Sequence, residues 1–264
     1  MEPTKHIVIF SHGFGVRKDA RGMFPEIVSA LGDIQPVLFD YNEINETDGT
    51  LTVRPLKKQA GILREQIETT KAANPEAVID LICHSQGSLV AALAKPTGIR
   101  KTILLAPPFG MNSRMLATFA NRPGSKIDME GTSRLVRRDG SITLVPAEFW
   151  KERESIRPIE IYNALAQETE LVIIQANQDE VLEETDLSNL DPKIRIIKLD
   201  ADHNFTDQAR KPLLDTLKKI SAPEHMLAIP PQYHSLRYVR PIEWEAVFDA
   251  WRTGEASQEA WKKH

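Results

Sequence analysis

Three residues, Ser85, Asp179 and His203, have the types and the chain order needed for nucleophilic attack on a carbonyl carbon. A serine hydroxyl is a weak nucleophile at neutral pH, so it needs a histidine as base, and the imidazole needs a carboxylate to orient it. We expect Ser85 to attack, His203 to take its proton and Asp179 to hold the imidazole. Each of them follows an apolar run typical of a buried strand, at residues 78–83, 170–176 and 193–199.

Ser85 lies in the segment Cys83-His84-Ser85-Gln86-Gly87, between an apolar, β-branched run and the alanine-rich run 88–94. A strand that turns directly into a helix pushes the residue at the corner into a sparsely allowed backbone region. Gly87 has no Cβ and lets the helix pack close to the strand. The segment matches the Gly-x-Ser-x-Gly nucleophile elbow except that Cys83 replaces the first glycine. We interpret Cys83 as a small buried spacer.

The segment Ser11-His12-Gly13-Phe14-Gly15 follows the first apolar run, residues 6–10. At an elbow of this kind, one backbone N–H from this loop and one from the residue after the nucleophile form the oxyanion hole. We expect the amides of Phe14 and Gln86 to be these donors. His12 is interpreted as a residue that hydrogen-bonds its own loop rather than as a base.

Asp202 is an alternative partner for His203 because it is adjacent in the chain. Neighbouring residues in an extended segment point to opposite sides, so Asp202 is expected to hydrogen-bond its own turn instead. Glu180 and Asp186 are weaker candidates. Asp179 comes from a separate strand end and is therefore preferred.

Strands that alternate with helices predict an α/β fold with a mostly parallel sheet and right-handed crossovers. Ligands gather at the carboxyl ends of the strands in such sheets, where all three candidate residues fall. The strands are expected at residues 6–10, 36–40, 78–83, 101–106, 170–176 and 193–199, and the helices at 23–31, 53–73, 88–94 and 206–220.

The alternation breaks between Phe109 and Arg157, where we expect an inserted cap. It should hold a helix at 111–120, a hairpin that turns at Asp139-Gly140 and a helix that starts near Pro146. Its aromatic residues Phe119, Phe149 and Trp150, together with His84 of the elbow, are expected to line the substrate pocket. The alternative is that the three aromatic rings only attach the cap to the core and that His84 stacks against the loops. The charged run 151–154 is interpreted as a solvated helix face.

This pattern divides the chain into a core at 1–222, interrupted by the cap at 109–157, and a C-terminal extension at 223–264. The extension carries three of the four tryptophans and is expected to be helical and packed on the core.

Composition narrows the class of protein further. The 264 residues carry a formal net charge of -4, so there is no basic footprint for nucleic acid. No apolar run is long enough to span a bilayer, no signal peptide is evident and the single cysteine suits a reducing compartment. We expect a cytoplasmic monomer or homodimer with no membrane partner, no cofactor and no metal site, since the histidines lack metal-ligand spacing.

The motifs together resemble the α/β-hydrolase superfamily over roughly Lys5 to Ile220. The resemblance rests on His12-Gly13, His84-Ser85-Gln86-Gly87, Asp179-Glu180-Val181 and Asp202-His203-Asn204-Phe205. The cap resembles that of bacterial cinnamoyl- and feruloyl-esterase-like hydrolases and of serine-aminopeptidase-type relatives. Asp40-Tyr41-Asn42-Glu43 departs from the Gly-x-Gly often found there in the superfamily.

The expected function is hydrolysis of a small carboxylic ester through an acyl-enzyme. A thioesterase or peptidase would use the same three residues, because acyl-transfer machinery does not specify the leaving group. A ligand-binding module on the same fold is the alternative from a different class, since fold alone does not imply function.

Overall fold

The computed structural model describes residues 5–111 and 113–221. Its central sheet is parallel throughout, with the strand order β10-β9-β6-β5-β1-β2. The predicted α/β fold with a mostly parallel sheet is confirmed. The strands are β1 (His6–Ser11), β2 (Gln35–Leu38), β5 (Val78–His84), β6 (Lys101–Leu105), β9 (Glu170–Ala176) and β10 (Arg195–Leu199).

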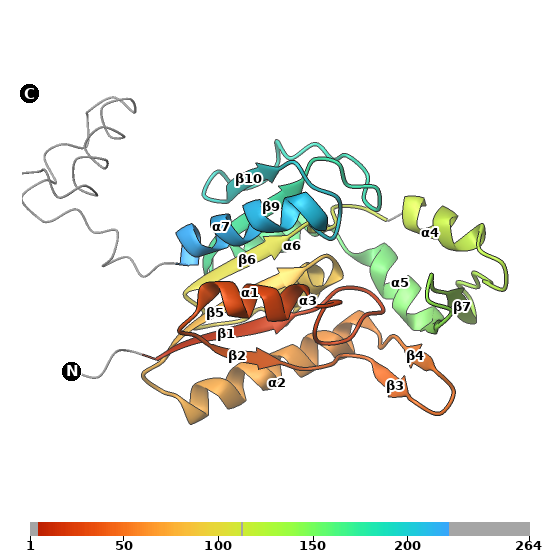
Figure 1. Ribbon diagram of the computed structural model, residues 1–264, viewed down its shortest axis with the longest axis horizontal. Helices are drawn as coiled ribbons and strands as arrows, with labels where there is room; N and C mark the ends of the chain where they lie inside the picture. The colour runs from red at the N-terminus through yellow and green to blue at the C-terminus, as the bar shows by residue number, and fades with distance from the viewer. Residues whose placement is uncertain (1–4, 112, 222–264) are drawn as a thin grey trace, which may run out of the picture. The chain divides into compact units, whose positions relative to one another are not determined.

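Helices cover both faces of this sheet (Figure 1). α1 (Met23–Leu31) and α7 (Arg210–Ser221) pack on one face and bury a cluster that includes Phe24 and Leu217. On the other face lie α2 (Leu56–Ala73), α3 (Gln86–Ala94) and α6 (Pro158–Leu165). The sequence analysis did not predict α6.

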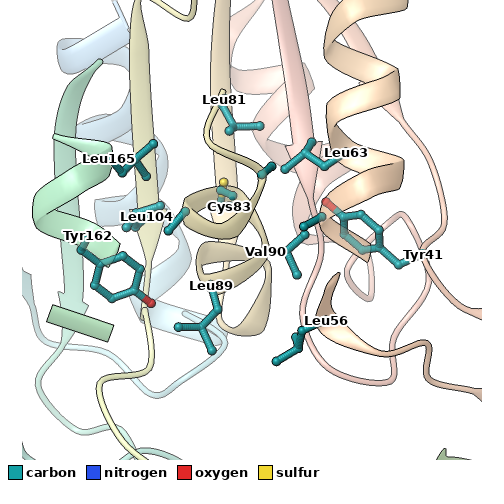
Figure 2. Packing of buried hydrophobic residues seen from close by; sticks show 14 of the residues in the cluster. Tyr41, Leu56, Leu63, Leu81, Cys83, Leu89, Val90, Leu104, Tyr162 and Leu165 are labelled. Atoms are coloured by element: carbon teal, nitrogen blue, oxygen red, sulfur yellow. The ribbon is translucent and has the colours of Figure 1, made fainter. Parts of the chain in front are cut away.

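β5 is buried on both faces because it lies inside the sheet and is covered on both sides. Leu81 and Cys83 point into one apolar cluster and Ile82 into the other. Figure 2 shows Cys83 packed among the leucines contributed by β5, α3 and β6. The continuous apolar run that preceded the elbow is thus explained by burial on both faces. The structure also confirms Cys83 as a buried spacer.

The hairpin predicted in the insertion is confirmed, and it belongs to a second sheet. β7 (Thr132–Val136) and β8 (Ile142–Pro146) pair antiparallel, and β8 then pairs in parallel with β4 (Thr50–Thr52). β4 in turn pairs with β3 (Glu43–Asn45), which gives the order β3-β4-β8-β7. The sequence analysis predicted neither β3 nor β4. The inserted segment is therefore joined by a second, earlier segment of the chain.

The two helices of the insertion are α4 (Ser113–Ala120) and α5 (Ala147–Ser155). The interpretation of run 151–154 as a solvated face is wrong for Arg153, which is only 5% exposed and donates a hydrogen bond to the carbonyl of Gly110. Phe149, Trp150 and Arg153 are the buried residues of α5, and their spacing puts them on one side of the helix.

Element ends differ from the expectation by a few residues. α2 begins at Leu56 rather than at Val53, since the amide of Val53 donates to the carbonyl of Leu144 in β8. A 3-10 turn at Asp207–Ala209 precedes α7. The expected extension at 223–264 lies outside the described residues. Among the helices of the described part of the chain, none has the length and apolarity needed to cross a bilayer.

Candidate active site

Ser85 stands at a sharp corner between β5 and α3. Its φ of 51° and ψ of -123° lie in a region that side chains rarely adopt, as a nucleophile elbow requires. The amide of Ser85 donates to the carbonyl of Leu105 at 2.8 Å, which ties the corner to β6. A Cβ built on Gly87 would overlap the carbonyl of Ser11 in β1, so only glycine allows α3 to lie this close to the sheet.

His203 lies between Ser85 and Asp179. Its Nε2 is 2.9 Å from Oγ of Ser85, and its Nδ1 is 2.7 Å from Oδ2 of Asp179. The three residues follow the ends of β10, β5 and β9, which all open onto the same edge of the parallel sheet. Both His203 and Ser85 are buried. The hydroxyl is thus placed to give its proton to Nε2 while the carboxylate holds Nδ1–H.

Asp179 is held in its ionised form by its surroundings. Burial alone would raise the pKa of its carboxyl group, but the hydrogen bond and charge of His203 and the amides of Leu182 and Val181 lower the pKa overall. These amides donate to Oδ1 at 2.7 and 2.8 Å, which leaves Oδ2 for the imidazole. The carboxylate is therefore both charged and fixed in orientation.

The other carboxylates near His203 have different partners. Asp202 accepts hydrogen bonds from the amide and the hydroxyl of Thr206 at 2.6 and 2.8 Å, so the expectation that it bonds its own turn is confirmed. Glu180 accepts from the backbone amide of His203 at 3.1 Å, and Asp186 binds Ser188. Among the described residues, only Asp179 contacts the imidazole through a carboxylate.

The backbone amides of Phe14 and Gln86 are the candidate oxyanion donors. Neither amide donates to a protein acceptor among the described residues. Gln86 is the first residue of α3, where the helix leaves its N–H groups unpaired. The Phe14 loop lies beside the nucleophile, because a Cβ on Gly13 would come within 3.3 Å of the Ser85 Cβ. Two unpaired N–H groups near a serine are what a developing oxyanion needs.

Two further histidines of the site act through hydrogen bonds. The amide of Tyr41 donates to Nε2 of His12 at 3.0 Å, so Nδ1 carries the proton and donates to the carbonyl of Gly13 at 3.0 Å. Burial also lowers the pKa of His12 and keeps it neutral. The interpretation of His12 as a loop-bonding residue is confirmed. His84 donates through Nε2 to the carbonyl of His203 at 3.0 Å.

A cavity of about 440 Å³ opens over Ser85. The four residues expected to line a pocket, His84, Phe119, Phe149 and Trp150, all border it. The sequence analysis missed the arginines of its wall, which are Arg21, Arg122, Arg137, Arg138 and Arg153. The pair Arg137-Arg138, just before the hairpin turn, was the available signal. Within the described part of the chain, no group of three or more His, Cys, Asp or Glu is arranged to hold a metal ion.

Comparison with known proteins identifies the fold. No protein-family model and no curated protein matches the chain. Among solved structures, Est1E from Butyrivibrio proteoclasticus with ferulic acid bound is 17% identical with a TM-score of 0.62, covering 83% of this chain and 90% of that one. An esterase from Pyrococcus furiosus is 17% identical with a TM-score of 0.55, covering 82% of each chain.

An α/β serine hydrolase homologue from Coxiella burnetii is 14% identical with a TM-score of 0.53, covering 84% of this chain and 87% of that one. The chain has the α/β-hydrolase fold. The resemblance to the α/β-hydrolase superfamily is thus confirmed at the level of the fold.

Proposed function

We propose that this protein is a serine hydrolase that cleaves a small carboxylic ester through an acyl-enzyme. The observation that carries the proposal is the unbroken chain of contacts from Ser85 Oγ to His203 Nε2 at 2.9 Å and from His203 Nδ1 to Asp179 Oδ2 at 2.7 Å. A strained backbone at Ser85 adds support, because such strain is expected where a nucleophile must be presented to a substrate.

In the first half-reaction, Oγ of Ser85 attacks the ester carbonyl carbon while Nε2 of His203 takes the hydroxyl proton. The carbonyl oxygen becomes an oxyanion and accepts hydrogen bonds from the amides of Phe14 and Gln86. His203 then gives the proton to the departing alcohol oxygen as the acyl–oxygen bond breaks. Water repeats the sequence on the acyl-enzyme, which releases the carboxylic acid and restores the serine.

The choice of an ester is supported by the pocket and by the similar structures. Phe119, Phe149 and Trp150 give the cavity over Ser85 an apolar wall suited to a small organic acyl or alcohol group. The similar structure from Pyrococcus furiosus is named an esterase, and that of Est1E was solved with ferulic acid bound. At 17% sequence identity, these structures support an expectation for the substrate class, and no residue role is transferred from them.

A fluorophosphonate probe tests the nucleophile directly. It should label the wild-type protein and not Ser85→Ala, whose ester turnover should fall on the order of 10⁴-fold or more. Ser88→Ala is the matched control, because this buried serine of α3 has no partner for its hydroxyl among the described residues and should label normally. Near-normal turnover in Ser85→Ala with unchanged circular dichroism would contradict the assignment.

A substrate screen tests the bond that is cleaved. It compares p-nitrophenyl esters, thioesters and aminoacyl amides under matched conditions, with kcat/KM as the measure. Esters are expected to give the highest kcat/KM. A clear preference for thioesters or amides would replace the esterase assignment with the corresponding acyl-transfer activity, and labelling without turnover of any of them would favour a binding module.

A further inference from the structure

The wall of the cavity carries a marked excess of positive charge. The described residues that line it include five arginines but only two acidic residues, Asp139 and Glu180. Glu180 is engaged by the backbone amide of His203. A general acyl-transfer site needs no such charge. The excess of positive charge therefore indicates that the ligand carries a further group besides the ester bond.

Arg137 is the most firmly held of these arginines. Its Nε donates to the hydroxyl of Thr143 at 2.8 Å, and its Nη2 donates to the carbonyl of Phe14 at 3.4 Å. Its guanidinium carbon lies 5.0 Å from the ring centre of Phe119 and 5.4 Å from that of Phe14. The guanidinium is thus within cation–π distance of two aromatic rings beside the Phe14 loop, and its Nη1 hydrogens have no protein acceptor among the described residues.

This guanidinium has no carboxylate partner in the described part of the chain. No carboxylate oxygen lies within 4.0 Å of its nitrogens. Burial and then the charges of Arg21 and Arg122 lower the pKa of Arg137 to about 10, which still leaves it charged at neutral pH. The charge of Asp139 acts in the opposite direction, but this carboxylate is not within ion-pair distance of Arg137. A partly buried cation without a direct counter-ion is costly unless an anion neutralises it. A bound ligand is the available source.

The backbone around the loop makes room for this arrangement. A Cβ built on Gly15 would overlap Nη2 of Arg137, so the glycine gives the guanidinium its place beside the loop. Ala20 and Arg21 both adopt positive φ, at 48° and 59°, where the loop brings Arg21 to the cavity wall. Strained backbone of this kind persists where the surrounding structure requires it.

We propose that the substrate carries, besides the scissile ester, an anionic oxygen group, a carboxylate or a phosphate, that binds the guanidinium of Arg137. The proposal rests on the proposed function, since the same cavity borders Ser85 and Arg137. A guanidinium presents a planar fork of N–H groups that matches both anions, and the contacts with Thr143 and the two aromatic rings hold this fork in place. Arg21 and Arg122 raise the positive potential without forming the direct contact.

The first test compares matched substrates that differ only in this charge. Mono-p-nitrophenyl esters of succinate, glutarate, adipate and suberate are each paired with the methyl-capped neutral diester. The wild-type kcat/KM should favour the charged member of at least one pair on the order of 10- to 100-fold, the value of a charged hydrogen bond. A ratio near one for every chain length, with both members hydrolysed, would overturn the proposal and leave the esterase assignment intact.

Variants assign the preference to one residue. In Arg137→Gln, the ratio of kcat/KM for the charged and the neutral substrate should fall to about one. Arg137→Lys keeps the charge but loses the planar fork, so it should retain part of the preference for the charged substrate. Arg134→Gln is the control, because Arg134 is on β7, three residues before Arg137, is exposed and donates to the carbonyl of Gly124 instead of lining the cavity. A ratio that survives in Arg137→Gln and Arg137→Lys alike would overturn the proposal. Should Arg137→Gln not fold, Arg137→Lys decides.

A second test reads binding without turnover. In the Ser85→Ala background, calorimetry measures binding of monomethyl adipate, methyl phosphate and neutral dimethyl adipate. Binding of the first or the second, lost when Arg137→Gln is added, supports a carboxylate or a phosphate respectively. Binding of neither anion, or equal binding of the neutral diester, would overturn the proposal. Failure of the fluorophosphonate probe to label Ser85 would instead refute the proposed function. The calorimetric test would still show whether an anion binds at Arg137, because it does not depend on turnover.

Discussion

The imidazole of His84 donates a hydrogen bond through Nε2 to the backbone carbonyl of His203 at 3.0 Å. The residue before the candidate nucleophile therefore holds the main chain of the candidate base, and the two rings lie 5.2 Å apart. Burial and then the charge of His203 lower the pKa of His84 to about 3, so it is neutral near physiological pH and cannot compete as a base. This contact makes His84 a positioning residue as well as a part of the cavity wall.

Replacing His84 should therefore affect turnover more than substrate binding. In His84→Phe, kcat is expected to fall on the order of tenfold with KM nearly unchanged, because the main chain at His203 loses its anchor and the imidazole is less well placed. His84→Gln keeps an N–H donor and should recover part of the loss. Steady-state kinetics on a p-nitrophenyl ester check this. Equal losses in both variants, or a change confined to KM, would count against a positioning role.

The two carboxylates near His203 should differ sharply when each is changed to the amide. Asp179→Asn should lower turnover on the order of 10³- to 10⁴-fold, because the amide favours the wrong imidazole tautomer. Asp202→Asn should cost about tenfold or less, since Asp202 contacts only Thr206 of its own turn. Both kcat values are measured under the same conditions. A larger loss at Asp202 would mean that the wrong carboxylate has been assigned.

The free energy of unfolding should decrease in acid, partly because the buried imidazole of His84 resists protonation in the folded protein. Its pKa is lowered from 6.5 when unfolded to about 3 when folded, so between these values the unfolded chain binds a proton that the folded protein does not. The free energy of unfolding therefore rises with pH in this window and falls as pH drops from about 6.5 toward 3, by at most ~1.4 kcal/mol per pH unit for this group. The pKa of His12 is lowered too and acts in the same direction.

Urea unfolding of wild type and His84→Gln at a series of pH values checks this. The free energy of unfolding should fall more steeply with decreasing pH in the wild type than in the variant. The difference in this free energy between the two proteins should therefore become smaller at low pH. Parallel pH dependences in the two proteins would contradict the role of His84.

Gly87→Ala should damage the fold, because the added methyl group overlaps the carbonyl of Ser11 and backbone cannot move aside cheaply. We expect a loss of at least about 1–3 kcal/mol, the usual cost of overpacking. Gly61→Ala in α2 is the matched control, since nothing lies within 4 Å of its added Cβ. It should stabilise by roughly 0.5–1 kcal/mol through helix propensity. Thermal melts check both, and equal melting temperatures would contradict the packing argument.

Ser133 should be a stability determinant of the second sheet. Its buried Oγ accepts from Nε1 of Trp150 at 3.0 Å and also contacts the main chain of Asp128. Ser133→Ala leaves the indole N–H unpaired and should cost about 1–3 kcal/mol. Ser141→Ala, at an exposed position of the same hairpin, should cost much less. Denaturant unfolding compares them, and similar losses in both would show that the Trp150 contact contributes little.

The sequence alone predicted the parallel sheet and the meeting of Ser85, Asp179 and His203. Each of these residues follows an apolar run, and the carboxyl ends of parallel strands reach the same edge of a sheet, so their order in the chain was enough to bring them together. The elbow was predictable for a different, local reason. Its strand, its corner and its glycine are adjacent in the chain.

Only the tertiary structure decided which segments form the wall of the cavity beside Ser85, Asp179 and His203. β3 and β4 are three residues each and carry too little local pattern, and β4 gains its partner from β8, which lies far away in the sequence. Arg153 was interpreted as part of a solvated helix face and Arg137 was not singled out, because arginine is usually exposed. What places them at the cavity is their contact with Gly110 and Phe14, and contacts between distant segments leave no local pattern to read.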